Sequence, residues 1–144
     1  MQPYPYMDKK AYPLPASPFR AVGIGLRAKH YADMLEEIPD IGWIEVHAEN
    51  YFGGGIHRYH LAGARELYPL SLHAVGLSLG SDQPVDPEHL RQFKELITIF
   101  EPFQVSDHLS WSASGNAHLN DLLPLPYTQE TLQRLCDNIG RVQN

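Results

Sequence analysis

The feature that most constrains the fold of this chain is a repeated order of short apolar runs and helical patterns. Four apolar runs of strand length occur, and apolar residues with helical spacing follow each of them. Strands separated in this way pair in parallel, because the intervening helix carries the chain back to the starting edge of the sheet. The repetition therefore predicts an α/β fold with a parallel sheet made of four βα units.

Local signals place these elements along the chain. Strands are expected over residues 21–27, 43–50, 70–73 and 103–108, the last ending near Trp111. Helices are expected over residues 31–38, 56–68, 87–100 and 128–142. Asp86 and Pro87 give the third helix a clear start, because Asp is a favoured N-cap and Pro suits the first helical position. A loop rich in Ser, Gly and Asn is expected between the fourth strand and Pro124.

Composition limits the size of the fold and its partners. A chain of 144 residues with 43% hydrophobic residues can form one globular domain, which we expect over residues 21–144, after an extended lead-in rich in Pro and Tyr over residues 1–20. The net charge of −6 and the lack of a basic run argue against nucleic acid as a partner. The sequence also lacks a secretory h-region and any apolar run near the roughly 20 residues that span a bilayer.

The only cysteine, Cys136, excludes an intrachain disulfide and favours a reducing compartment. We therefore expect a cytoplasmic protein. Cys136 is expected beside the apolar side of the last helix, as an inert core thiol.

The run over residues 43–50 carries the densest chemistry in the sequence. Side chains alternate across a strand, so one face is apolar and the other carries Glu45, His47 and Glu49. Two further strands end in groups of the same kind, which are His73, Asp107 and His108. The carboxyl ends of parallel strands open onto one crevice, so the histidines are expected to lie together there.

Polar residues on the strands favour a barrel over an open sheet covered by helices on both sides. Glu45, His47 and Ser71 occupy positions that would face a barrel lumen, whereas a doubly covered sheet would be apolar on both faces. A (β/α)8 barrel of the TIM type needs eight strands and about 250 residues. Four βα units therefore predict one half of such a barrel.

Five linked motifs carry a resemblance to a known family. They are GIGLR (23–27), WIEVHAENYFGGG (43–55), LSLHAVGLSLGS (70–81), VSDHLSW (105–111) and LNDLLPLPYT (119–128). In this order they resemble the MbnB-like family of multinuclear non-haem iron-dependent oxidative enzymes, with the match running from about Ala21 to the last residue. The resemblance implies a TIM-type barrel whose C-terminal mouth holds two or three iron ions. Known members use oxygen to modify cysteine residues of a ribosomally made precursor peptide, which a separate partner protein usually presents.

The resemblance also implies roles for particular residues. His47, His73 and Asp107 match motif positions of metal ligands, and His108 matches a ligand or its neighbour. The family often has Glu where this chain has Asp107, whose side chain is one methylene shorter. In the family the chain continues into four more strands with further ligands, so this chain corresponds to the N-terminal half and is expected to be incomplete and inactive alone.

Other polar residues are candidates for supporting roles. Imidazole and carboxylate ligands suit iron, and each ligating His needs a partner for its second nitrogen. The candidates for that partner are Glu45, Glu49 and Asn50. Arg27 is a candidate to bind a substrate carboxylate or to form a salt bridge, and His118 and Asp121 are candidates to contact substrate from a loop. The histidines expected on the solvated surface are His30, His57, His60 and His89.

Three classes of function remain open at this stage. The first is the peptide-modifying iron oxidase, or its N-terminal half, with no catalytic residue assigned. The second is another divalent-metal TIM-barrel enzyme, such as a sugar isomerase or an endonuclease. The third is a truncated or split product without activity, which folds only with a partner. A four-stranded half-barrel would expose two strand edges, so we expect a homodimer or a complementing C-terminal half.

Overall fold

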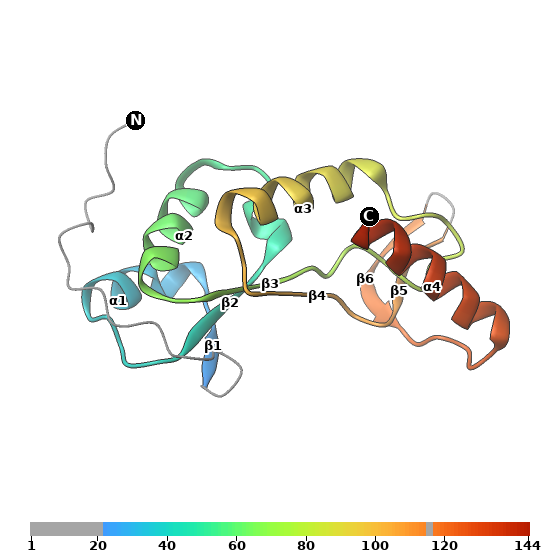
Figure 1. Cartoon of the computed structure of the whole chain (residues 1–144), viewed down its shortest axis with the longest axis horizontal. Helices are drawn as coiled ribbons and strands as arrows, with labels where there is room; N and C mark the ends of the chain where they lie inside the picture. The colour runs from blue at the N-terminus through green and yellow to red at the C-terminus, as the bar shows by residue number, and fades with distance from the viewer. Residues whose placement is uncertain (1–21, 115–116) are drawn as a thin grey trace.

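The computed structural model describes residues 22–114 and 117–144, so the predicted lead-in over residues 1–20 lies outside the described residues. Figure 1 shows four strands and their helices following one another along the chain. In chain order the elements are β1 (Gly23–Gly25), η2 (Ala28–His30), α1 (Tyr31–Glu36), β2 (Trp43–His47), η3 (Ala48–Tyr51), α2 (Gly55–Leu67), β3 (Leu70–His73), α3 (Pro87–Phe100), β4 (Gln104–Ser106), β5 (Trp111–Ser114), β6 (Ala117–Leu123) and α4 (Gln129–Gln143).

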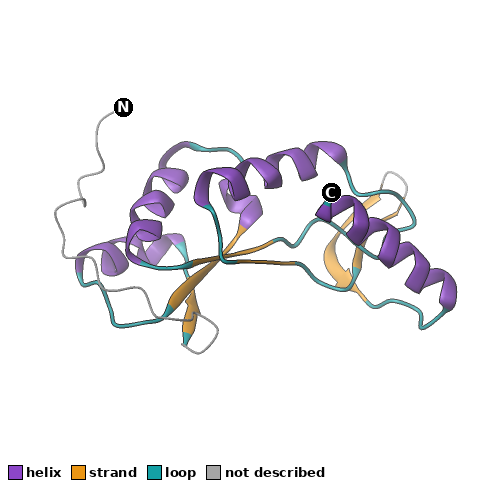
Figure 2. Ribbon diagram, in the orientation of Figure 1, coloured by secondary structure: helices purple, strands orange, loops and turns teal. Residues whose placement is uncertain are grey.

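The strands β1 to β4 form one parallel sheet in the order β1-β2-β3-β4. Helices α2 and α3 lie on the same side of this sheet (Figure 2). Sequential parallel strands joined by helices are the repeating unit of a TIM-type barrel. The predicted class, an α/β fold with four parallel βα units amounting to half of such a barrel, is confirmed.

The core lies between the sheet and its helices. Its strand residues are fully buried because alternate side chains of β2 and β3 point toward the helices; they are Ile44, Val46, Leu70 and Leu72. The helices contribute Leu61, Phe93 and Leu96, which are also fully buried. Removing these side chains from water is the main source of stability for the sheet and its helices.

Several sequence signals produce the expected local structure. Asp86 caps α3, since its Oδ1 accepts a hydrogen bond from the Glu88 amide at 3.1 Å. Thr128 caps α4 in the same way through the Thr131 amide. The two outer strands of the sheet each have one neighbour, as expected, and their apolar residues Ile24 and Val105 are exposed.

The prediction of a loop between the fourth strand and Pro124 is wrong, because β5 and β6 form an antiparallel hairpin there. Its strands pair from Trp111 opposite Leu123 to Ser114 opposite Ala117. The hairpin is tied to the loop after β3. Ser78 Oγ accepts hydrogen bonds from the amides of Ser112 and Ala113, and Ser81 Oγ donates to the Ala113 carbonyl.

The predicted core position of Cys136 is also wrong, because this thiol is exposed. The residues of α4 that are buried are Leu135 and Asn138. Asn138 Nδ2 donates a 2.9 Å hydrogen bond to the Leu79 carbonyl, so α4 packs with a polar residue against the loop after β3. Of the apolar residues expected on the inner side of this helix, Leu135, Ile139 and Val142 pack with the core, whereas Leu132 is exposed.

Within residues 22–114 and 117–144, no helix has both the length and the apolar character that are needed to cross a membrane.

Candidate functional site

Three histidines meet where β2, β3 and β4 end. His47 and His73 are directly opposite in the register of β2 and β3, and their ring centroids are 5.5 Å apart. His108 follows β4 by two residues, and its Nε2 lies 2.9 Å from Nε2 of His73. Parallel strands bring their carboxyl ends to one edge of the sheet, which explains why residues 26 to 61 positions apart converge here.

His73 is held in one orientation. Its Nδ1 lies 2.9 Å from Ser106 Oγ, the residue opposite it on β4. Burial and the neighbouring His108 lower the pKa of His73. The neutral ring is therefore favoured, and a neutral imidazole is the form that binds metal ions.

Asp107 lies beside the histidines, but its carboxylate contacts backbone amides. Oδ2 accepts a hydrogen bond from the Leu77 amide at 3.2 Å, and Oδ1 accepts one from the His108 amide. Burial raises the pKa of Asp107 to about 6, although both hydrogen bonds act in the opposite direction. In the described residues Asp107 thus fixes the loop after β3 against the strand end that carries His108, and its role as a metal ligand stays a prediction.

Glu45 has a different partner from the one expected. Its Oε2 accepts a 2.8 Å hydrogen bond from Ser71 Oγ on the neighbouring strand. Ser71 is fully buried, so this bond satisfies a hydroxyl that would otherwise be costly. No hydrogen bond joins Glu45, Glu49 or Asn50 to His47 or His73 in the described part of the chain, and their supporting role stays a prediction.

Glu49 does not share a strand face with Glu45 and His47, because β2 ends at His47 and η3 begins. The turn directs Glu49 Oε1 to the amides of Val75 and Gly76, both at 2.8 Å. Burial raises the pKa of Glu49, but the His89 ring and these amides outweigh it and lower the pKa to about 2. Glu49 therefore carries a negative charge that anchors the loop after β3.

His89 and His60 are not the solvated surface residues that the sequence predicts. His89 Nε2 is 3.2 Å from Glu49 Oε1, and its ring packs edge-on against Phe52. Among the described residues, His89 Nε2, Glu49 Oε2 and His60 Nδ1 are buried without a hydrogen-bond partner. The position of His89 near the start of α3 did not indicate burial, because His89 is partly buried where η3 packs against α3. His30 and His57 are exposed, as predicted.

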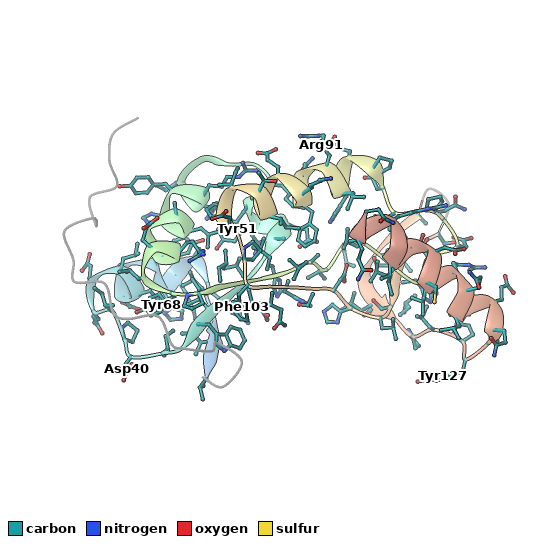
Figure 3. All side chains as sticks on the ribbon, in the orientation of Figure 1. Asp40, Tyr51, Tyr68, Arg91, Phe103 and Tyr127 are labelled. Carbon is teal, nitrogen blue, oxygen red and sulfur yellow. The ribbon has the colours of Figure 1, made fainter. Side chains whose placement is uncertain are left out.

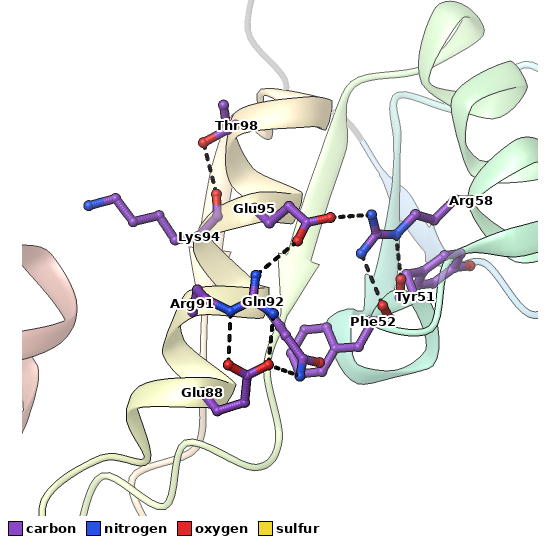
Figure 4. A network of polar contacts seen from close by, with 9 residues as sticks. All are labelled: Tyr51, Phe52, Arg58, Glu88, Arg91, Gln92, Lys94, Glu95 and Thr98. Carbon is purple, nitrogen blue, oxygen red and sulfur yellow. Dashed lines mark hydrogen bonds and ion pairs between the residues drawn. The ribbon is translucent and has the colours of Figure 1, made fainter. Parts of the chain in front are cut away.

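Arg58 fixes the end of η3, the turn that follows His47 (Figure 4). Its guanidinium donates to the carbonyls of Tyr51 at 2.6 Å and Phe52 at 3.1 Å, and to Glu95 Oε1 at 2.5 Å. One side chain of α2 therefore connects the turn to α3. The sequence showed no signal for this role, since an Arg on a helix is usually a solvated residue.

Two cavities lie on either side of His47, which lines both. The larger, of about 700 Å³, extends from Glu49 and His89 to the β6 residues Asn120 and Asp121. The smaller, of about 520 Å³, extends from His47 toward Arg27 at the end of β1. Cavities of this size accommodate small ligands or parts of peptides. The predicted substrate residues Arg27 and Asp121 thus each line a cavity that reaches His47, whereas the side chain of His118 lies outside the described residues.

The spacing of the site histidines decides whether one metal ion fits between them. No group of three or more His, Cys, Asp or Glu side chains over residues 22–114 and 117–144 is arranged to hold one. The pair of His73 and His108 nevertheless fits: an ion about 2.1 Å from each nitrogen in octahedral geometry separates adjacent ligands by about 3 Å, close to the observed 2.9 Å. The spacing of these two nitrogens is thus compatible with one metal ion, and their role as metal ligands stays a prediction.

Comparisons with known proteins agree on one relationship. A family model described as "RiPP precursor modification enzyme MbnB/TglH/ChrH" matches residues 21–144. A UPF0276 protein of Acaryochloris marina is 47% identical over 124 residues, which are 86% of this chain and 45% of the relative. A UPF0276 protein of Vibrio vulnificus is 47% identical over 85% of this chain and 43% of its own length. One of Caulobacter vibrioides is 46% identical over 86% of this chain and 45% of its own length. The chain thus spans less than half the length of these relatives.

Proposed function

Because the chain belongs to the MbnB/TglH/ChrH family of RiPP precursor modification enzymes, we propose that it acts in the modification of a ribosomally made peptide. More specifically, it contributes one part of an iron centre that oxidises cysteine residues of that peptide. The relatives are more than twice as long as the matched segment, so the remaining ligands would come from a segment of the kind they contain. A separate protein would present the peptide, in a reducing cytoplasm that keeps its cysteines as thiols.

The observation that carries this proposal is the approach of His73 Nε2 to His108 Nε2 at 2.9 Å, with His47 beside them. Two ring nitrogens at this distance either share one proton or bind one cation. Iron binds imidazole nitrogen and carboxylate oxygen, and Glu45, Glu49 and Asp107 all lie close to this edge of the sheet. Cys136, the only cysteine of the sequence, lies on α4 and lines neither cavity beside His47, so it does not offer a thiolate to this site.

Residues of this chain would have different roles at the proposed iron site. Ser106 holds Nδ1 of His73, so that Nε2 faces the metal position, and His108 supplies a second nitrogen. Asp107 and Glu49 bind backbone amides of residues 75–77 and thereby hold the loop that borders the site. Bound iron would supply the electron transfer and the reaction with oxygen. The cavities beside His47 would hold the part of the peptide that carries the reacting cysteine.

A chimera tests this proposal directly. The matched segment of the Vibrio vulnificus relative is replaced by residues 21–144 of this chain, and the product is loaded with iron without oxygen. A Cys-containing precursor peptide and the protein that presents it are then added with or without oxygen, and the mass of the peptide is measured. A mass change that requires both iron and oxygen is expected for the chimera and for its His30→Ala control, and none for His73→Ala.

Other outcomes assign the chain to another class. Turnover with a different divalent ion and no oxygen requirement would indicate a different metal-dependent barrel enzyme. A folded chimera that binds no metal would indicate that the histidines of this chain are structural.

A further inference from the structure

The smaller cavity beside His47 has features of a binding site for an anionic group. Its volume is about 520 Å³, and its lining residues include Gly25, Arg27, Tyr31, Tyr51 and His57. These residues come from β1, the start of α1, η3 and α2. Polar groups from four separate elements that converge on one cavity are typical of ligand sites.

Arg27 provides a cation at this cavity that has no ion-pair partner within residues 22–114 and 117–144. It follows β1, is exposed, and forms no ion pair with another described residue. The salt bridge that the sequence left open as its alternative role is thus not found among the described residues. At Gly25, which lines the same cavity as Arg27, an added Cβ would meet no described atom within 4 Å, so the backbone there leaves open space. A planar guanidinium binds a carboxylate with two parallel hydrogen bonds when such space exists.

Tyr31 and Tyr51 provide a hydroxyl hydrogen without an acceptor. Their oxygens are 2.7 Å apart, and the residues are only 8% and 2% exposed. One hydrogen forms the bond between the two hydroxyls, and neither hydroxyl has a second partner among the described residues. A buried hydroxyl hydrogen needs an acceptor, which a ligand in the cavity would supply. Burial and the Tyr31 hydroxyl raise the pKa of Tyr51, so the pair stays neutral and able to donate.

From this geometry we propose that the smaller cavity binds a carboxylate group, with the Arg27 guanidinium as its ion-pair partner and the Tyr31–Tyr51 hydroxyl pair as an additional donor. On the proposed function, the carboxylate belongs to the peptide substrate, either at its C-terminus or on an acidic side chain. His47 lines the same cavity, so a carboxylate held at Arg27 would position the adjoining residues of the peptide against the three histidines.

Glu45 is the acidic residue in the lining of this cavity, and its position is compatible with the proposal. Its Oε2 accepts the Ser71 hydroxyl on the β3 side, away from β1 and Arg27. The remaining lone pairs of the Glu45 carboxylate can accept a peptide N–H of the bound segment. The cavity thus offers donors at the Arg27 end and an acceptor near His47.

Binding of short peptides to the 144-residue chain tests the proposal without metal or oxygen. The probes are acetyl-Gly-Cys-Gly with a free C-terminal carboxylate, the same peptide as its amide, and acetyl-Asp-Cys-Gly amide. Affinity is measured by NMR titration of the backbone amides, whose spectrum also reports whether each variant is folded. At least one acidic probe is expected to bind about tenfold or more tightly than the neutral amide, and the acidic probe that binds identifies the source of the carboxylate.

Two pairs of variants separate the site from general charge and packing effects. Arg27→Gln is expected to weaken binding about tenfold, and Lys29→Gln, which removes an equal charge from an exposed residue outside the cavity, is expected to leave it unchanged. The double variant Tyr31→Phe, Tyr51→Phe removes both hydroxyl hydrogens and is expected to weaken binding severalfold. Its control is Tyr127→Phe at the fully exposed residue near the start of α4 (Figure 3).

Equal binding of all three probes, or equal loss with Lys29→Gln and Arg27→Gln, would overturn the proposal. Because these measurements need no iron, they are independent of the proposed function. A chain that binds the acidic probe but gives an inactive chimera would retain the carboxylate site and refute the iron chemistry.

Discussion

Replacement of Arg58 by Met tests how the turn after His47 is held. Met keeps most of the aliphatic length but removes a guanidinium that donates to the Tyr51 and Phe52 carbonyls at 2.6 and 3.1 Å and to Glu95 Oε1 at 2.5 Å. Hydrogen bonds from charged groups contribute about 1.5 to 3 kcal/mol each, and the Arg58 side chain is only 20% exposed. Glu95 is 39% exposed, so solvent screens its ion pair with Arg58 and the two carbonyl bonds account for the expected effect. We expect Arg58→Met to lower the free energy of unfolding by about 3 kcal/mol.

Arg91→Met is the matched control. Arg91 contacts Glu88 and Glu95 on the same helix, but its side chain is 59% exposed (Figure 4). Exposed ion pairs of this kind contribute about 0 to 1 kcal/mol. Urea unfolding of both variants and the unchanged chain, at one protein concentration, gives the comparison. An equal loss of stability in the two variants would refute the assignment of Arg58 as the residue that anchors η3.

Three further predictions concern single residues. Glu49 has a pKa lowered to about 2 from an ordinary 4.5, so it stabilises the fold above pH 4.5, and this contribution is lost as the pH falls toward 2. Between these pH values the free energy of unfolding should drop by about 2 to 3 kcal/mol more in the unchanged chain than in Glu49→Gln. An equal drop in both proteins, measured by urea unfolding, would contradict this prediction. Asp86→Ala should destabilise the chain by about 1 kcal/mol in urea, because it removes the N-cap of α3, and no change would show the cap to be dispensable. Cys136 should react with a maleimide in the folded chain nearly as fast as a free thiol. A reaction slower by more than about a hundredfold would show that the thiol is buried.

The parts of the fold that could be predicted from sequence are those that local chemistry determines. The strand Leu70–His73 lies between Pro69 and a loop that contains Gly and Ser, and its bounds match the prediction. The start of α3 follows from Asp86 and Pro87. Asp86 accepts a hydrogen bond from a free amide of the first turn, and Pro87 has the backbone angle that the first helical position needs. Repetition of these units was enough to predict the parallel sheet and the meeting of His47, His73 and His108 at one edge.

The parts that could not be predicted depend on contacts between distant segments. Glu49 continues the alternation of β2, yet the backbone turns at His47, and amides 26 and 27 residues away bind its carboxylate. Burial of Asn138 in place of Cys136 likewise depends on the Leu79 carbonyl. The hairpin of β5 and β6 is a different case, because the Ser, Gly and Asn content of this stretch is typical of a loop, and its two strands pair with each other rather than with the parallel sheet.

Iron bound per chain in histidine variants tests the central claim most directly. Iron affinity would be measured anaerobically for the chimera and for its His73→Ala, His108→Ala and His30→Ala variants. If the 2.9 Å pair of His73 and His108 binds iron, the first two variants should lose at least the 10- to 100-fold in affinity that is typical even of residues supporting a ligand, while His30→Ala keeps the full amount. Unchanged iron affinity in both His73→Ala and His108→Ala would contradict the claim and leave these histidines as a structural hydrogen-bonded pair.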